Sequence, residues 1–290
     1  MTALFSRNVA ALAPSATIAV SREAARLKQE GVNVVDLGAG EPDFATPKVV
    51  AEAGNRATLR GETHYSPTEG IMELRAAIAR RLSLMSGGRA VNADNIVVSN
   101  GSKQSVFNAS LCLFGSNDKV LIPTPAWTSY PQIVHLARAT PVEVPGDPEW
   151  SLKVSTKDLD RWHDDAVKGL ILNTPVNPTG AVYTHGELKA LLEWAARKGV
   201  WVICDEIYRN IHYGSGPAPS VLDFPDELLE RVVLVDGASK SFAMTGWRIG
   251  FAYAARELTK TMNALQSHTT SGANTMAQWV TLNPDIGPIS

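Results

Sequence analysis

The sequence predicts an α/β fold in which helices cover both faces of a mostly parallel sheet. From about Asp94 onward, short apolar runs rich in β-branched residues alternate with longer segments of helical character. The short runs show no regular alternation of polar and apolar residues, which is typical of strands buried on both faces. Helical segments between such strands indicate the crossover connections of a parallel sheet.

The expected elements follow one another closely along the chain. Four apolar residues share one face of an amphipathic helix expected over residues 71–84: Ile71, Leu74, Ile78 and Leu82. Residues 36–47 are rich in Gly and Pro and are expected to be irregular. Strands are expected at 95–99, 119–123, 141–144, 169–172, 200–204, 232–235 and 249–253, and further helices at 102–114, 184–198 and 256–268.

The length of 290 residues is enough for one large domain and part of a second one. The sequence contains neither an internal repeat nor a low-complexity segment. A helix-like run at residues 273–282 gives way to the breaker-rich tail 283–290. This ending suggests that the second domain is incomplete.

The composition excludes several classes of protein. With 44% hydrophobic residues, 19% charged residues and a net charge of −2, no basic surface for nucleic acid or an anionic membrane is expected. Cys112 and Cys204 lie in apolar surroundings, which favours buried thiols in a reducing compartment. The six histidines lack metal-ligand spacing, so no metal site is expected. Because neither a signal peptide nor a membrane span is evident, we expect a cytoplasmic protein.

Polar residues recur where the expected strands end, and ligands of open parallel sheets bind at that edge. Gly101 and Ser102 follow the strand at 95–99 and open a helix, whose free N–H groups favour an anion. Trp127 follows the strand at 119–123 and offers a face on which a flat ring can stack. Each feature alone also fits a structural role, as a helix cap or as core packing.

Two further strand ends add an amide and a carboxylate. Pro175 and Pro178 fix the backbone on either side of Asn177, which indicates an amide held in a defined direction. Asp205 ends the strand at 200–204, and a buried carboxylate there needs a positive partner, such as a protonated ring nitrogen. A helix cap or an ordinary salt bridge is the alternative for Asp205.

Lys240 follows the strand at 232–235 among small and apolar residues. Desolvation there would lower the pKa of its amine and make it a nucleophile toward an aldehyde, whereas an isolated lysine is ordinarily a solvated surface charge. Arg248 comes shortly afterwards and can bind a phosphate with its forked guanidinium. Together, these strand-end residues match what a phosphorylated pyridine aldehyde requires.

The motifs around these residues resemble those of the class I, fold-type I aminotransferases. They are SKSFAMTGWRIG around Lys240, NPTG at 177–180 and DEIY at 205–208. The resemblance extends from about Pro14 to Leu282. It is closest to the bacterial aspartate and aspartate/prephenate aminotransferases, as PSATIAV, GAGEPDF, THYSPTEG and NGSKQSVFN indicate. It implies a fold-type I large domain, pyridoxal 5′-phosphate as cofactor and a homodimer.

The resemblance also implies a role for each matching residue. Lys240 is expected to form the aldimine and to move a proton between the substrate and the cofactor. Asp205 is expected to pair with the pyridine nitrogen and keep it protonated. Further cofactor contacts are expected from Gly101, Ser102, Trp127, Asn177, Tyr208, Ser239 and Arg248, and from Tyr65 across a subunit interface. Substrate contacts are expected from Gly40, Lys103, Trp127 and Asn177.

The sequence departs from the family pattern in two places. Gly237 stands three positions before Lys240, where many members carry a serine that contacts the phosphate. The arginine that binds the substrate α-carboxylate comes from the small domain, and no residue of this sequence matches it. The resemblance assigns residues 1–45 to the small domain or substrate lid and 46–282 to the cofactor-binding large domain, with 283–290 as a divergent tail.

The expected activity is transfer of an amino group between aspartate or glutamate and a 2-oxo acid. Lys103 supports these substrates because the matching lysine of the aspartate-type subgroup helps to recognise a distal carboxylate. One alternative is a truncated, catalytically impaired fragment that retains cofactor or partner binding. Another is a lyase or synthase on the same scaffold. A dinucleotide-binding enzyme is disfavoured because no G-x-G-x-x-G motif follows an expected strand.

Overall fold

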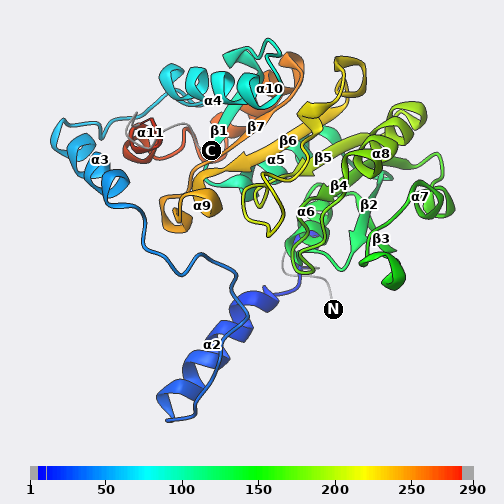
Figure 1. The fold of residues 1–290 in the computed structure, drawn as a ribbon, viewed down its shortest axis with the longest axis horizontal. Helices are drawn as coiled ribbons and strands as arrows, with labels where there is room; N and C mark the ends of the chain where they lie inside the picture. The colour runs from blue at the N-terminus through cyan, green and yellow to red at the C-terminus, as the bar shows by residue number, and fades with distance from the viewer. Residues whose placement is uncertain (1–5, 11, 283–290) are drawn as a thin grey trace.

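The computed structural model describes residues 6–10 and 12–282. Its centre is a seven-stranded sheet with the strand order β1-β7-β6-β5-β4-β2-β3 (Figure 1). Strands β2 to β6 run parallel to one another, whereas β7 is antiparallel to both β6 and β1. The strands are β1 (Ile96–Ser99), β2 (Lys119–Thr124), β3 (Thr140–Pro145), β4 (Val167–Asn173), β5 (Trp201–Asp205), β6 (Val232–Gly237) and β7 (Gly250–Tyr253). The expected mostly parallel sheet is therefore confirmed, while the expected divergent tail at 283–290 lies outside the described residues.

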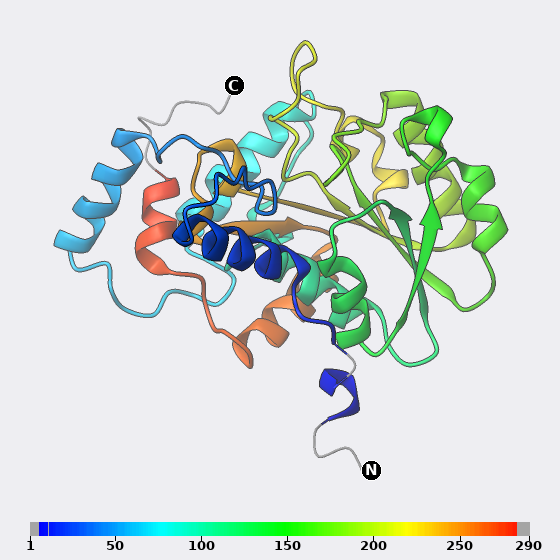
Figure 2. The same ribbon diagram turned by 90° about the horizontal axis from the view of Figure 1, so that it is seen from below.

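Helices cover both faces of this sheet. Apolar residues of α5, α6 and α10 pack into the core on one face, and those of α4, α7 and α8 pack on the other. Near the chain's end, α11 lies beside α3 (Figure 2). The helices are α1 (Arg7–Ala10), α2 (Ala16–Gln29), α3 (Lys48–Leu59), α4 (Met72–Met85), α5 (Ser102–Leu113), α6 (Ser129–Leu136), α7 (Thr156–Trp162), α8 (His185–Lys198), α9 (Ala238–Ser241), α10 (Arg256–Ser267) and α11 (Thr275–Thr281).

The central strands are apolar because they are buried on both faces. Consecutive residues of a strand point to opposite sides of the sheet. Accordingly, Leu170 and Leu172 of β4 belong to the core on the α8 side, and Ile171 between them belongs to the core on the α5 side. A run with no polar alternation is what this two-sided burial requires.

Local signals set the ends of the covering helices. Thr184 and Glu187 form a capping box at the start of α8, in which each side chain accepts a hydrogen bond from the other residue's backbone N–H. Gly199 ends the same helix in the left-handed conformation, with φ of 68°. The expected helix at 184–198 is confirmed to within one residue.

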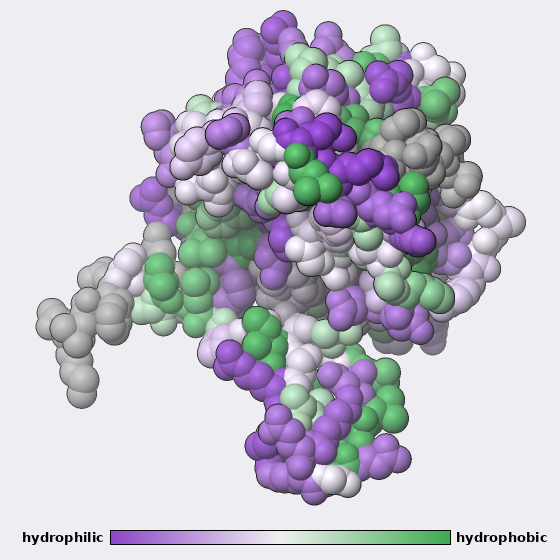
Figure 3. Space-filling view, turned by 90° about the vertical axis from the view of Figure 1, so that its left-hand side faces the viewer, coloured by the Kyte–Doolittle hydropathy of each residue, from purple (hydrophilic) through white to green (hydrophobic). Residues whose placement is uncertain are grey.

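The N-terminal segment is set apart from the sheet. Helix α2 extends away from the rest of the molecule (Figure 1), and hydrophobic side chains lie on the surface of this extension (Figure 3). Ile18 and Val20 are 55% and 52% exposed there. Residues 31–47 form neither helix nor strand, which confirms the irregular segment expected from its Gly and Pro content.

Within residues 6–10 and 12–282, no helix is both long and apolar enough to cross a membrane. In the same residues, no group of three or more His, Cys, Asp and Glu side chains is arranged to hold a metal ion.

Candidate active site

One edge of the sheet collects the strand-end residues. Because β1 and β6 are both antiparallel to β7, β1 points in the same direction as the central parallel strands. The carboxyl ends of β1, β2, β4, β5 and β6 therefore share an edge with the beginning of β7. The residues that this arrangement brings to the edge are Gly101, Ser102, Trp127, Asn177, Asp205, Ser239, Lys240 and Arg248.

The first part of the site is built for an anion. Helix α5 begins after Gly101, whose φ of 82° favours glycine. The Arg248 guanidinium donates hydrogen bonds to the backbone oxygens of Asn100, at 3.2 Å, and Thr245, at 2.8 Å. A Cβ atom on Gly101 would lie 2.2 Å from the Arg248 Nη2 atom. Glycine therefore lets a guanidinium lie directly against the N-terminus of a helix, and both attract negative charge.

Two more glycines allow the main chains to approach closely at this point. A Cβ atom on Gly250 would lie 2.2 Å from the backbone nitrogen of Ser102. A Cβ atom on Gly237 would lie 2.7 Å from the backbone oxygen of Ile249. The sequence has glycine here where many family members carry serine. In this structure, neighbouring backbone occupies the space that a serine side chain would need.

An aromatic pair lies beside the anion cradle. The Lys103 Nζ atom lies 4.6 Å from the centroid of the Trp127 ring. Trp127 in turn meets the Tyr130 ring edge-on, with 5.3 Å between ring centroids. Burial lowers the pKa of Lys103, and the positive charge of Arg248 lowers it further. The two cations are thus close enough to interact, which favours a ligand with negative charge between them.

Asp205 is buried at the end of β5, with 3% of its surface exposed. Its carboxylate accepts hydrogen bonds from the Tyr130 hydroxyl, at 2.9 Å, and from the Ile207 N–H, at 3.1 Å. Burial raises the pKa of Asp205 to about 6, although both hydrogen bonds act in the opposite direction. Among the described residues, no Lys, Arg or His forms an ion pair with this carboxylate. The structure thus places a buried acid at the expected strand end, where no cation of the described residues balances its charge.

The Lys240 amine is partly buried at the same edge. It donates a hydrogen bond to the backbone oxygen of Gly40 and lies 5.6 Å from the centroid of the Tyr208 ring. Burial lowers the pKa of Lys240, Glu41 opposes this shift, and Arg248 adds to it. The direction of the shift agrees with the sequence-based expectation and increases the fraction of uncharged, nucleophilic amine.

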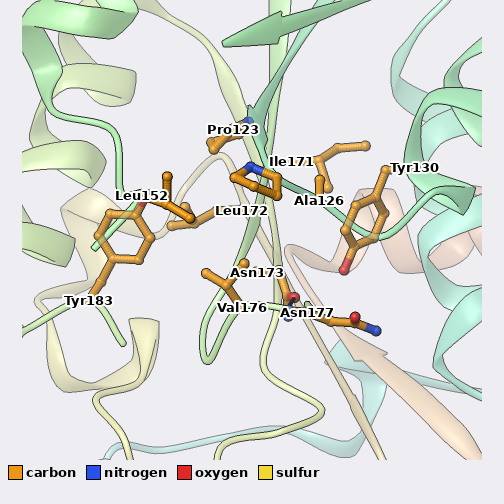
Figure 4. A pocket seen from close by; sticks show the side chains of 11 residues that line it. Pro123, Ala126, Tyr130, Leu152, Ile171, Leu172, Asn173, Val176, Asn177 and Tyr183 are labelled. Carbon is orange, nitrogen blue, oxygen red and sulfur yellow. Dashed lines mark hydrogen bonds between the residues drawn. The ribbon is translucent and has the colours of Figure 1, made fainter. Parts of the chain in front are cut away.

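Asn177 is held in one direction by its turn. Its backbone N–H donates to the Asn173 side chain at 2.7 Å, and Gly180 closes the turn with an N–H bond to Val176 O at 2.7 Å. The Asn177 amide donates to the Tyr208 hydroxyl at 3.1 Å. Figure 4 shows Asn177 and Tyr130 beside a small cavity. Other residues lining it are Pro123, Pro125, Ala126, Leu152, Ile171, Leu172, Asn173, Val176 and Tyr183.

Tyr65 is the expected site residue that the structure does not bring to this edge. Its surface is 99% exposed. Conversely, the sequence analysis missed Tyr130 and Glu41, which contact or influence Asp205 and Lys240. The only sequence signal for Tyr130 is its position one helical turn after Trp127. Taken together, the edge combines an anion-attracting helix start, an aromatic ring, a buried carboxylate and a partly buried amine.

Comparisons with known proteins agree with this geometry. The family described as "Aminotransferase class I and II" matches residues 32–283. A probable aspartate/prephenate aminotransferase of Rhizobium leguminosarum bv. phaseoli is 42% identical over 92% of this chain. An aspartate aminotransferase of Geobacillus stearothermophilus is 38% identical over 97% of the chain. The solved structure of Thermus thermophilus aspartate aminotransferase with maleate superposes with a TM-score of 0.91 and 39% identity over 97% of the chain.

The shared region is only part of each relative. The chain spans 66% of the Rhizobium protein and 72% of both the Geobacillus protein and the Thermus structure. The family match nevertheless covers most of this chain, including every residue of the sheet edge described above. The chain belongs to the class I and II aminotransferase family.

Proposed function

We propose that this chain is the cofactor-binding part of an aminotransferase that moves an amino group between aspartate or glutamate and a 2-oxo acid. The observation that carries the proposal is the buried Asp205 carboxylate, which has no cationic partner among the described residues and lies at the same edge as the Lys240 amine. A buried, unpaired charge is costly. A protonated pyridine nitrogen would remove this cost, and the phosphate of the same cofactor would account for the neighbouring anion cradle.

The residues fit pyridoxal 5′-phosphate at each part of the molecule. Four of them would surround the phosphate: Gly101, Ser102, Ser239 and Arg248. Asp205 would hold the proton on the ring nitrogen, and Trp127 would stack on the ring. The Asn177 amide and the Tyr208 hydroxyl, already in contact, would bind the oxygen on the ring. When bound, this cofactor supplies an electron sink that stabilises negative charge on the α-carbon of the amino acid.

Lys240 would do two things in this site. Its uncharged amine would be the nucleophile toward the aldehyde, whose oxygen would leave as water, and the lowered pKa increases the share of that form. When free of the cofactor, the Nζ atom would be the base that takes the proton from the substrate α-carbon and the acid that returns it to the cofactor. The Gly40 backbone oxygen, which accepts a hydrogen bond from Nζ, would orient the amine.

Acidic substrates are supported by the charge at the mouth of the site. Lys103 is exposed and lies over the Trp127 ring, beside the place proposed for the cofactor. Its amine can reach a carboxylate at the far end of a bound amino acid. The similar Thermus structure was solved with maleate, which is a four-carbon dicarboxylate. Gly40 and Asn177 would contact the substrate nearer its reacting end.

The exposure of Tyr65 on an anchored segment supports a homodimer. The neighbours of Tyr65 are fixed by side chains of α11: Thr275 donates to the backbone oxygen of His64 at 2.8 Å, and Gln278 donates to the Ser66 hydroxyl at 2.9 Å. Tyr65 itself is nearly fully exposed. An exposed aromatic side chain on an anchored segment suits a contact with a second subunit. We propose that the Tyr65 hydroxyl contacts the phosphate that the partner subunit binds.

The N-terminal segment is proposed to cover the substrate. Residues 1–45 would belong to a small domain or lid, and residues 46–282 would form the large domain. The extension of α2 and the contact of Gly40 with Lys240 support this division. Free Cys112 and Cys204 suit a reducing cytoplasm, in which we place the enzyme.

The first prediction tests the proposed attachment of the cofactor. After incubation with pyridoxal phosphate and reduction with borohydride, peptide mapping should find the phosphopyridoxyl group on Lys240. Lys240→Ala should lose this adduct completely because the proposed nucleophile is removed, whereas Lys189→Ala, on the exposed surface of α8, should retain it. An adduct on another lysine, or none on the unaltered chain, would overturn the proposed function.

A second prediction concerns the anion cradle. Gly250→Ala should weaken pyridoxal phosphate binding at least tenfold, because the added Cβ would collide with the backbone of Ser102 and Gly101, which cannot rotate away. Gly246→Ala is the matched control, since nothing lies within 4 Å of a Cβ there. Affinity is measured by fluorescence titration, and thermal unfolding separates loss of binding from loss of fold. Equal affinities of the two variants would contradict the cradle.

The third prediction concerns the substrate. With aspartate and 2-oxoglutarate, the chain should release oxaloacetate and glutamate without free ammonia. Lys103→Ala should raise the KM for aspartate about tenfold, because one charge-assisted hydrogen bond to the distal carboxylate is lost. The KM for alanine, which has no such carboxylate, should stay unchanged. Ammonia release would favour a lyase. Bound cofactor without turnover would favour an impaired fragment.

The fourth prediction concerns the dimer. Light scattering should give twice the chain mass, and cofactor affinity should increase with protein concentration as the dimer forms. Tyr65→Phe should form the dimer but bind pyridoxal phosphate several-fold more weakly, because one hydrogen bond to the phosphate is lost. Tyr213→Phe, at another fully exposed tyrosine, should bind as the unaltered chain does. A monomer with full affinity would contradict the role of Tyr65.

A further inference from the structure

Tyr130 is a buried tyrosine for which no role has yet been given. Only 2% of its surface is exposed, and it belongs to α6, which packs on the sheet face opposite α8. Its hydroxyl does not face solvent but donates to the Asp205 Oδ2 atom at 2.9 Å. The hydrogen bond joins residues from two elements, α6 and β5.

The two oxygens of the Asp205 carboxylate have different donors. The Oδ1 atom accepts the Ile207 backbone N–H, which comes from the same stretch of chain. The Oδ2 atom accepts a hydrogen bond from the Tyr130 hydroxyl, which is the only side-chain donor to Asp205 among the described residues. With one donor on each oxygen, the carboxylate cannot turn without breaking a hydrogen bond, so its remaining lone pairs have a fixed direction.

We propose that Tyr130 is a positioning residue that orients the Asp205 carboxylate and keeps it ionised for a protonated aromatic nitrogen. The proposal rests on the function proposed above and extends it to a residue that touches neither cofactor nor substrate. The Tyr130 hydroxyl acts through Asp205.

The environment of Asp205 explains why such help is needed. Besides Tyr130, the groups that interact electrostatically with Asp205 are the Tyr208 hydroxyl, the Cys204 thiol and the Asp236 carboxylate from β6, and none of these carries positive charge. Burial and Asp236 both raise the pKa of Asp205. The hydroxyl of Tyr130 opposes them and remains a donor, because burial and Asp205 raise the pKa of Tyr130 well above its ordinary value.

Tyr130 also supports the residue proposed to stack on the ring. Its ring meets Trp127 edge-on at 5.3 Å between centroids. A tyrosine-to-phenylalanine change keeps this aromatic contact and removes the hydroxyl alone. The Tyr130→Phe variant therefore isolates the hydrogen bond to Asp205 from the packing of α6.

The test compares two probes that differ at one ring atom. Pyridoxal phosphate has the ring nitrogen, and its 1-deaza analogue has a C–H group in that place. Tyr130→Phe should weaken binding of pyridoxal phosphate about tenfold, the value of a hydrogen bond to a charged group. Binding of the deaza analogue should change less than twofold, because this ring offers no proton for Asp205 to hold.

Tyr183→Phe is the matched control. Tyr183 is equally buried and lines the opposite side of the cavity in Figure 4. Its hydroxyl accepts the Val154 N–H at 3.0 Å, far along the chain from Asp205. This variant should lose thermal stability and keep both affinities. A merely structural role of Tyr130 would give the same result, or equal losses for both probes.

A double-mutant cycle and a titration give independent readouts. In the Asp205→Asn background, Tyr130→Phe should have no further effect on affinity, since the pair acts as a unit. In the chain without cofactor, ¹³C NMR should show the pKa of Asp205 rising from about 6 in Tyr130→Phe, because a donor that favours the ionised form is lost. Additive losses in the cycle, or an unchanged pKa of Asp205, would overturn the inference. Failure of the unaltered chain to bind either probe would instead count against the proposed function.

Discussion

Asp205 ends the central strand β5 with its carboxylate removed from water, and an ion in that position costs several kcal/mol unless it is compensated. Two hydrogen bonds compensate part of this cost, and the pKa of about 6 shows that a cost remains. A folded chain that retains such a group gains free energy when a cation binds to it. The site is therefore prepared for its ligand, and the ring nitrogen of pyridoxal phosphate would bring the missing charge.

The strand directions decide which residues can join Asp205. Arg248 precedes β7, so it reaches the shared edge only because β7 runs antiparallel to its neighbours. A parallel β7 would begin at the opposite edge and leave the helix start at Gly101 without its guanidinium. Glycine at 250 then lets the backbone of β7 lie against the start of α5, and glycine at 101 leaves space for the Arg248 guanidinium. The anion cradle thus depends on one reversed strand and on the absence of two side chains.

The sequence predicts most of this arrangement, because strand ends and buried polar residues leave local signals. Asp205 and Lys240 each follow an apolar run, and the structure places both at the expected edge. The direction of β7 leaves no such signal, since an apolar run reads alike in either direction. Tyr130 was missed because its importance depends on β5 and α6 meeting in space. At Gly237 the sequence indicates a missing hydroxyl, whereas the structure adds that neighbouring backbone occupies the space for a side chain.

The charges along the edge also select one orientation of a ligand. The cations Lys103 and Arg248 influence each other near the start of α5. Asp236 acts on Asp205 at the ends of β6 and β5, where burial raises the pKa of both acids to about 6. Arg81 and Arg209 oppose this rise in the pKa of Asp236. A molecule with an anionic group at one end and a protonated nitrogen at the other satisfies both regions in one orientation only. The reversed molecule would bring like charges together at both ends, and such contacts cost several kcal/mol. The charges of the edge would therefore favour a single orientation of such a ligand.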